Sequence, residues 1–169
     1  MKLSSRLVVG AVAGFVGTMA MTTAMRKLHA RLPARERYPL TPREIVDSAV
    51  APSDEAARDL TIAAHFLYGA ACGALLAAAS ERPGKVTGAA AGAAIWVASY
   101  MGWIPAVSLL EPATAHPLRR NALMIGVHLV WGSATAGAIR ELSEARDTIF
   151  AAGPDKDVPA GRSATSRPA

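Results

Sequence analysis

Charged side chains are absent from four long windows of this chain, and apolar residues recur throughout each of them. The windows cover residues 7–25, 60–79, 86–110 and 121–139. A helix of such length, with a rise of ~1.5 Å per residue, crosses a hydrocarbon core of roughly 30 Å. A helix of a soluble protein would instead carry a charged stripe on its outer face. The pattern therefore predicts an all-α integral membrane protein whose four spans pack as a four-helix bundle.

Two local signals refine this arrangement. In the first loop, Thr41 precedes a proline, and Glu44 follows three residues later. This order is typical of a capping box with Thr41 as the N-cap, so we expect a short interfacial helix over about residues 42–51. In the third span, Pro105 lacks a backbone donor and is expected to kink or end the helix.

Small residues follow a matching order in two parts of the chain. An offset of 78 relates Gly10 to Gly88, and an offset of 63 relates the phrase at His65 to the phrase at His128. Two duplicated hairpins, related by an axis along the membrane normal, would account for both offsets. Small residues also let neighbouring backbones approach closely. The expected helix-packing residues are Gly10, Gly14, Gly69, Gly73, Gly88, Gly92 and Gly132.

The net charge of +5 and the pI of about 9.9 admit several kinds of partner. Because the basic residues lie in short loops and a tail, we expect anionic lipid headgroups as partners and no nucleic acid. Nine basic residues fall on each side of the predicted spans, so the orientation in the membrane stays open. Pro, Gly, Ser and Arg are frequent in residues 154–169, which predicts a disordered tail after a membrane domain of residues 1–153.

Two histidines lie inside the charge-free windows, and an ionisable group at membrane depth is a functional candidate. The phrases that contain them are His65-Phe66-Leu67-Tyr68-Gly69 and His128-Leu129-Val130-Trp131-Gly132. A facing pair of neutral imidazoles could ligate a haem iron or join a metal site, and the glycines would leave room for a haem. The histidines could also contact a proton or a substrate, or donate to neighbouring carbonyls and fix helix packing. No other cofactor is expected.

The remaining candidates are polar residues near the span ends. They are Tyr38, Arg43 and Glu44 in the first loop, His116, Arg119, Arg120 and Asn121 at the start of the fourth span, and Tyr68 and Trp131 beside the histidines. Two arginines at a helix start oppose the helix dipole unless they bind an anion, so we expect Arg119 and Arg120 to contact lipid phosphate. The sequence has no Gly-rich phosphate loop, nucleophile elbow, CxxC or HExxH motif. No catalytic residue is predicted.

Several phrases in order carry a family resemblance. They are Arg37-Tyr38-Pro39-Leu40-Thr41-Pro42-Arg43-Glu44, the His65 phrase, Ser99-Tyr100-Met101-Gly102-Trp103-Ile104-Pro105, and Arg120-Asn121-Ala122-Leu123-Met124-Ile125 with the His128 phrase. Over roughly residues 7–140 the chain resembles the YagU-like small bacterial inner-membrane proteins. The resemblance implies a multi-pass protein of the bacterial inner membrane and supplies no catalytic residues.

These observations favour a non-enzymatic membrane protein. It would assemble with itself or with another membrane protein through its Gly/Ala faces, or it would form a small polar path past His65 and His128. The alternative is a redox membrane protein that binds haem or a metal through the same two histidines.

Overall fold

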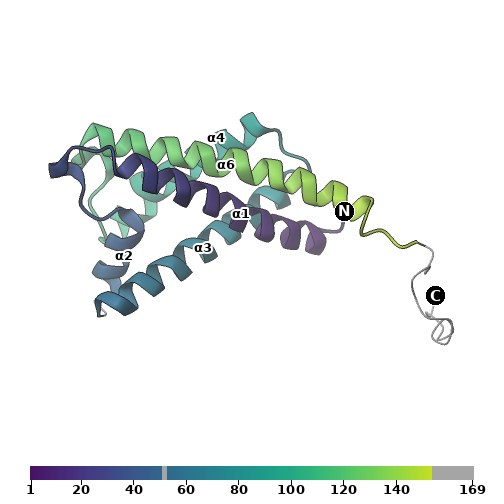
Figure 1. The fold of residues 1–169 in the computed structure, drawn as a ribbon, viewed down its shortest axis with the longest axis horizontal. Coiled ribbons are helices and arrows are strands. Elements are labelled where there is room, and N and C mark those ends of the chain that lie inside the picture. Colours follow the sequence, from purple (N-terminus) through teal and green to yellow (C-terminus); the bar gives the residue numbers. More distant parts are fainter. Residues whose placement is uncertain (51–52, 154–169) are drawn as a thin grey trace.

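The structure is a computed structural model that describes residues 1–50 and 53–153, and these residues form helices and connecting turns without β-strands. In chain order (Figure 1), the elements are α1 (Leu3–His29), the 3-10 helix η1 (Ala34–Glu36), α2 (Thr41–Val50), α3 (Asp54–Ala79), α4 (Lys85–Val97), the π-helix η2 (Ala98–Trp103), α5 (Ile104–Ala106), the 3-10 helix η3 (Ala113–Ala115) and α6 (Leu118–Asp147). The predicted tail, residues 154–169, and the predicted end of the interfacial helix at residue 51 lie outside the described residues.

Helices α1, α3 and α6 are each long and apolar enough to cross a membrane. Large apolar side chains point outward from α1 and α3, since Val8 is 65% exposed, Leu67 71% and Leu75 68%. Exposed apolar surface on this scale is unfavourable in water and suits contact with lipid. The prediction of an all-α fold is therefore confirmed for the described residues, and three of the helices fit the prediction of transmembrane spans.

Most of the window over residues 86–110 is helical, but it is not one regular α-helix. Helix α4 has only 13 residues and is followed by η2, within which Gly102 leaves the helical region at φ −112°, ψ −105°. Helix α5 then ends at Ala106, directly after Pro105. A backbone break and a missing donor within one turn explain why this window is not one continuous α-helix.

The capping box predicted at the start of α2 is not formed. The hydroxyl of Thr41 is buried and has no hydrogen-bond partner. Instead, the backbone amides of Arg43 and Glu44 donate to the carbonyl of Leu40, over 2.9 and 3.2 Å. The helix therefore begins one residue earlier than expected, at Thr41.

Glycines set the closest approach between helices α1 and α3. A Cβ added at Gly10 would collide with the carbonyl of Gly73, and one added at Gly14 would collide with the carbonyl of Gly69. Because glycine has no side chain, the two backbones touch directly at these points.

Helices α4 and α6 approach each other in the same manner. A Cβ at Gly88 would collide with the carbonyl of Gly132, and one at Gly92 would collide with the carbonyl of His128. All seven glycines expected in helix packing thus lie in contacts within one chain.

Beyond the glycine contacts, α3 diverges from α1 and α6, as Figure 1 shows. Helix α2 bridges the resulting gap and packs against α3, with Val46 only 5% exposed. The hydroxyl of Ser48 on α2 also donates to the carbonyl of Leu109, over 2.9 Å. The divergence leaves a wedge-shaped space between α3 and the other long helices, and we call this side of the molecule the wedge end.

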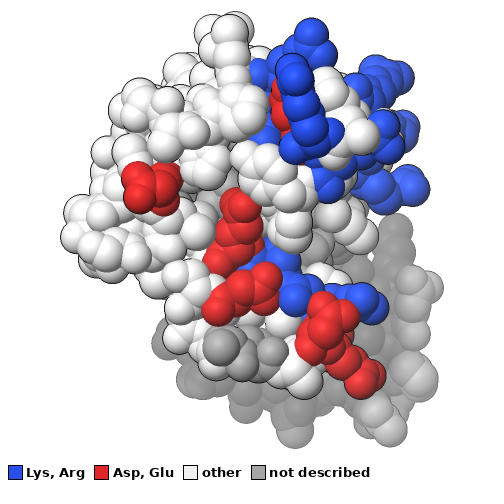
Figure 2. Space-filling view, turned by 90° about the vertical axis from the view of Figure 1, so that its left-hand side faces the viewer, with Lys and Arg blue, Asp and Glu red and all other residues white. Residues whose placement is uncertain are grey.

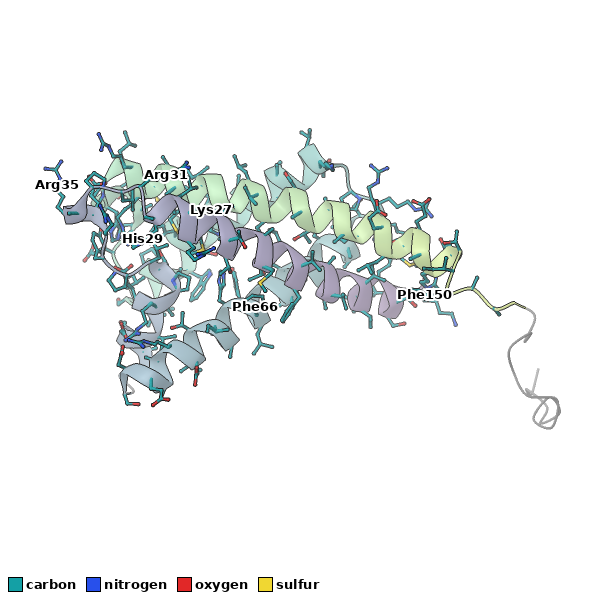
Figure 3. The ribbon with its side chains drawn as sticks, viewed as in Figure 1. Lys27, His29, Arg31, Arg35, Phe66 and Phe150 are labelled. Carbon is teal, nitrogen blue, oxygen red and sulfur yellow. The ribbon has the colours of Figure 1, made fainter. Side chains whose placement is uncertain are left out.

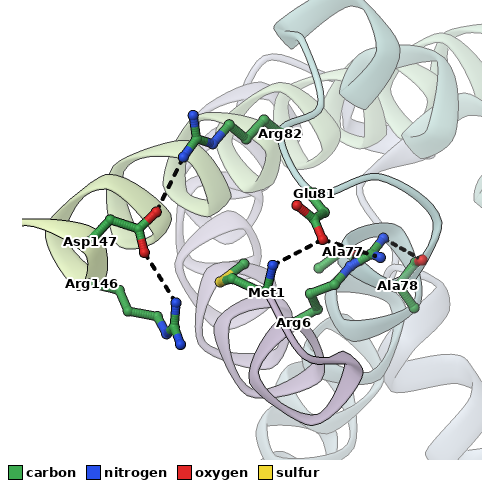
Figure 4. Close-up of polar contacts among 8 residues, drawn as sticks. All are labelled: Met1, Arg6, Ala77, Ala78, Glu81, Arg82, Arg146 and Asp147. Atoms are coloured by element: carbon green, nitrogen blue, oxygen red, sulfur yellow. Dashed lines mark hydrogen bonds and ion pairs between the residues drawn. The ribbon is translucent and has the colours of Figure 1, made fainter. Parts of the chain in front are cut away.

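The opposite side, where α1 begins, is closed by polar contacts between helices (Figure 4). The ammonium group of Met1 lies 3.2 Å from a carboxylate oxygen of Glu81. The Arg6 guanidinium donates to two carbonyls at the end of α3, over 2.8 and 2.6 Å. Arg82 and Asp147 form an ion pair of 3.2 Å between the α3–α4 turn and α6. We call this side the tied end.

Candidate functional site

A cavity of about 270 Å³ occupies the wedge, and we call it the wedge cavity. Its walls come from α1, α2, α3, α4, η2, α5 and α6, and they are largely apolar. All three tryptophans of the chain, Trp96, Trp103 and Trp131, contribute to the lining. Small-molecule sites in proteins are typically mostly apolar clefts of about 300–1,000 Å³ with a few polar groups. The wedge cavity lies just below that range.

Both predicted histidines line the wedge cavity. His128 Nδ1 lies 2.7 Å from the carbonyl of Met124. Since a carbonyl only accepts, Nδ1 carries the proton and Nε2 keeps the lone pair. His65 differs, because its Nε2 is buried without a hydrogen-bond partner. Within the described residues no hydrogen bond joins the two rings.

Two hydrogen bonds cross between helices at the cavity wall. The hydroxyls of Tyr68 on α3 and Ser99 on η2 lie 2.8 Å apart. The indole N–H of Trp131 on α6 donates to the hydroxyl of Thr18 on α1, over 3.2 Å. These side chains fix the positions of α3 and α6 beside the histidines, because each bond joins elements that are distant in sequence.

The glycines beside the histidines do not leave room for a haem, which corrects that expectation. A Cβ on Gly69 would collide with the hydroxyl of Thr18, and one on Gly132 would collide with the carbonyl of Gly88. Both positions are already filled by a neighbouring helix. Gly69 lines the wedge cavity, but the position of its missing side chain is occupied by Thr18 and offers no room for a haem.

A second space of about 300 Å³, here called the side pocket, lies between the ends of α1 and α3 beneath α2. Its lining includes Arg26 and His29 from α1 and Arg43 from α2. His65 and Pro42 line both the side pocket and the wedge cavity. These two residues therefore lie between the wedge cavity and a space that has two arginines in its lining.

Arg120 is the most deeply buried charged residue of the described chain, with 2% of its surface exposed. Its guanidinium donates to the carbonyls of Glu36, Tyr38 and Pro39, over 3.2, 3.0 and 2.8 Å. It also lies 3.4 Å above the ring of Tyr38 and 3.6 Å from a carboxylate oxygen of Glu44. The expectation that Arg120 contacts lipid phosphate is wrong, because the first loop encloses it. Arg119 is exposed.

Aromatic and polar residues extend this cluster toward the wedge cavity. The hydroxyl of Tyr38 lies 3.4 Å from His116 Nδ1, and the His116 ring stacks on Tyr100 with centroids 5.4 Å apart. Asn121 donates to the carbonyl of Ala113 over 2.6 Å. Tyr100 lines the wedge cavity. We call Arg120, Tyr38, Glu44, His116 and Asn121 together the arginine cluster.

Two charged residues of α2, Glu44 and Arg43, lie in different electrostatic environments. Burial raises the pKa of the Glu44 carboxyl, and this effect outweighs the opposing attraction of Arg120 and His116. Arg43, in contrast, forms ion pairs with Asp47 at 2.8 Å and with Asp54 at 2.9 Å. Arg43 thereby joins α2 to the start of α3.

Basic side chains gather on one side of the wedge end, while acidic side chains lie over α2 and the start of α3, as Figure 2 shows. Figure 3 places Lys27, His29, Arg31 and Arg35 together at this end of α1 and η1. The exposed basic residues here are Arg26, Lys27, Arg31, Arg35, Arg37 and Arg119. Anionic headgroups remain the expected partners of such a surface.

The residues of the wedge do not form a complete metal site. Within the part of the chain that the structure describes, no three His, Cys, Asp or Glu side chains lie close enough together to hold a metal ion. A metal bound by His65 and His128 would need its other ligands from outside the part of the chain that the structure describes.

Comparison with known proteins adds no relative. No family model, curated protein or solved structure matches this chain. The resemblance to the YagU-like proteins therefore stays a prediction.

Several cavity residues were absent from the sequence-based candidates. Thr18, Cys72, Trp96 and Ser99 line the wedge cavity. The signal that could have found Ser99 is its spacing of three residues from Trp96, which places both on one helical face. Thr18 gave no comparable signal, because its position depends on how α1 packs against α6.

Proposed function

We propose that this chain is a non-enzymatic, multi-pass membrane protein that takes a small, mostly apolar ligand from the bilayer into the wedge cavity. The supporting observation is an apolar cavity between diverging membrane helices that is lined by two histidines. An apolar space inside a membrane domain favours a ligand that partitions into lipid, and a few polar groups suffice to orient it.

The two histidines are the orienting groups in this proposal. His128 Nε2 offers a lone pair because Nδ1 is committed to the Met124 carbonyl. His65 Nε2 is buried without a partner, so a ligand atom would replace a missing hydrogen bond. The flat walls supplied by Trp96 and Trp131 give apolar contact around these polar points.

The two earlier expectations receive less support than ligand binding. Self-assembly through the Gly/Ala faces would need faces that are free, yet the predicted glycines contact other helices of the same chain. A polar path past the histidines would need a wetter lining than the mostly apolar residues of the wedge. Homo-oligomers could still form through other surfaces of the helices.

Two finer points belong to the same proposal. We infer a four-helix bundle of two similar hairpins, with α4, η2 and α5 taking the place of the fourth long span, in the bacterial inner membrane. Supporting this, Gly10 faces Gly73 and Gly88 faces Gly132. By the sequence offsets, Gly88 corresponds to Gly10 but Gly132 corresponds to Gly69. The two hairpins would therefore differ in pairing by one helical turn.

The redox alternative stays a lesser proposal. The nitrogens of His65 and His128 have the chemistry of haem ligands. The cavity of about 270 Å³ and the filled positions beside Gly69 and Gly132 do not favour a group as large as a haem. A Soret absorbance band in protein purified from native membranes would restore this alternative.

Ligand binding can be tested through the tryptophans, since all three line the wedge cavity. The full chain would be reconstituted in neutral phosphatidylcholine nanodiscs and titrated with methyl 12-bromododecanoate, a neutral lipophile whose bromine quenches nearby indoles. We expect saturable quenching that exceeds the linear quenching caused by probe dissolved in lipid. Quenching that stays linear throughout would contradict the proposal.

A matched pair of variants on α3 localises the signal. Cys72 is 9% exposed and lines the cavity, whereas Leu75 is 68% exposed on the same helix. Cys72→Phe should fill the cavity and remove the saturable component, and Leu75→Phe should keep it. Equal saturable quenching in both variants would place the probe elsewhere.

A further inference from the structure

The side pocket differs from the wedge cavity in its charge. Two arginines and two histidines are among its lining residues, and no acidic residue is. The wedge cavity, with which it shares His65 and Pro42, has no arginine, lysine or acidic residue in its lining. Two neighbouring spaces of this kind match a molecule with one charged end and one apolar end.

We infer that the ligand is an anionic amphiphile, with its acidic head in the side pocket and its alkyl chain in the wedge cavity. The inference rests on the proposed function, since it assigns the chemical class of the molecule that the wedge binds. The head would be a carboxylate or a phosphate, because both accept several charge-assisted hydrogen bonds.

Arg26 is the residue of the side pocket that we expect to bind the negatively charged head of the ligand. Among the described residues it forms no ion pair, and it lines the side pocket. Arg43 also lines the pocket, but Asp47 and Asp54 already balance its charge. Arg26 is an exposed guanidinium without a counter-ion among the described residues, and it can therefore pair with one anionic group.

The histidines of the side pocket support the same assignment. His29 Nε2 lies 3.1 Å from the carbonyl of Tyr38 and so donates to it, which fixes the ring near Arg26 on α1. His65 Nε2 has no partner and is buried at the junction of the two spaces. An acidic oxygen at the junction would satisfy this nitrogen while Arg26 neutralises the charge.

The remaining geometry accommodates the chain of the amphiphile. Beyond His65 the lining changes to Trp96, Met124 and Trp131, which have no charge. Together the two spaces would hold a single-chain lipid with its head toward the wedge end. At that end the exposed basic residues would also raise the local concentration of anions.

The test uses three probes that share one brominated chain: 12-bromododecanoate, 12-bromododecyl phosphate and the neutral methyl 12-bromododecanoate. Tryptophan quenching is measured for the full chain in phosphatidylcholine nanodiscs, at a pH at which the carboxylate is ionised. Each affinity is expressed relative to the concentration of the probe that is dissolved in the lipid. We expect the acids to bind about tenfold more tightly than the ester, the factor that one charge-assisted contact supplies.

Arg26→Gln should remove this preference for acids and leave binding of the ester unchanged. Arg31→Gln is the matched control, because Arg31 is an exposed arginine of the same end that does not line the side pocket. If the protein binds one of the two acids more tightly, that acid identifies the head group of the ligand as a carboxylate or a phosphate. Either result supports the inference.

The outcomes separate the two proposals. If acids and ester bind equally, or if Arg26→Gln and Arg31→Gln behave alike, the anionic assignment is overturned while ligand binding in the wedge stands. If none of the three probes gives saturable quenching, the proposed function itself fails.

Discussion

The two ends of the molecule join the same helices by different means. At the tied end, α1 and α3 are in backbone contact at Gly10 and Gly14, and partly exposed ion pairs link the chain segments around them. At the wedge end, α1 and α3 are apart, and the buried guanidinium of Arg120 holds the first loop against α6. One end is closed by close packing, whereas the other encloses space and depends on polar side chains.

This difference shows how a small membrane protein can combine closely packed helices at one end with a binding site at the other. Backbone contact needs residues without side chains, and it leaves no volume between the helices. A cavity needs the helices to separate, and the polar groups exposed by the separation must be satisfied by other means. At the wedge end, Arg120 satisfies three backbone carbonyls of the first loop.

The largest effect is expected from removing the central group of the wedge end. Arg120→Met would remove a donor from three carbonyls, of which only that of Tyr38 keeps another, from His29, and it would leave Glu44 without its counter-ion. The loss should be about 3–5 kcal/mol, as for a broken buried ion pair, measured as the free energy of unfolding in mixed micelles. Arg119→Met, at the exposed neighbouring position, should change it little. Equal losses in the two variants would show that Arg120 does not hold the wedge end.

A smaller effect is expected from adding one methyl group at the tied end. In Gly14→Ala the new methyl would collide with the carbonyl of Gly69, and we expect a loss of about 1–3 kcal/mol in the free energy of unfolding. Gly126→Ala is the matched control, because nothing lies within 4 Å of a Cβ there. It should be neutral or stabilising by up to about 1 kcal/mol, through helix propensity. A stable Gly14→Ala protein would mean that α1 and α3 are less closely packed than described.

The smallest effect concerns pH and should be confined to the wedge end. Because burial raises the pKa of Glu44, folding favours its protonated form. The resulting stability is fully present below the ordinary carboxyl pKa and is lost as the pH rises through the raised one. The difference in melting temperature between wild type and Glu44→Gln should therefore vary with pH across that interval. A constant difference would show that Glu44 is not desolvated.

The sequence predicted the long helices well because their signal is local. Absence of charge over about twenty residues marks α1, α3 and α6 whatever their neighbours are. The third window has the same absence of charge, yet it is broken at η2. Pro105 signalled a kink, but Ser99 and Tyr100 of the π-helical turn contact Tyr68 and His116, which are distant in sequence. Such packing cannot be read from composition.

The candidate site was predictable only in part. His65 and His128 stood out as ionisable residues in apolar windows, and both line the wedge cavity. The burial of Arg120 could not be predicted, because Pro39, one of its partners, lies 81 residues away in sequence. The same holds for the cavity itself, whose volume follows from the angle between α3 and the other helices.

The glycine contact between α1 and α3 also acts as a fulcrum. From Gly69 to the start of α3 at Asp54 the helix is about 22 Å long. A tilt of roughly 10° about Gly69 would move the start of α3 by about 4 Å, while the contact itself would hardly shift. Helix α2, which packs on that arm and is joined to it by Arg43 and Asp54, would travel with it. A change in the width of the wedge would therefore move α2, which lies at the surface.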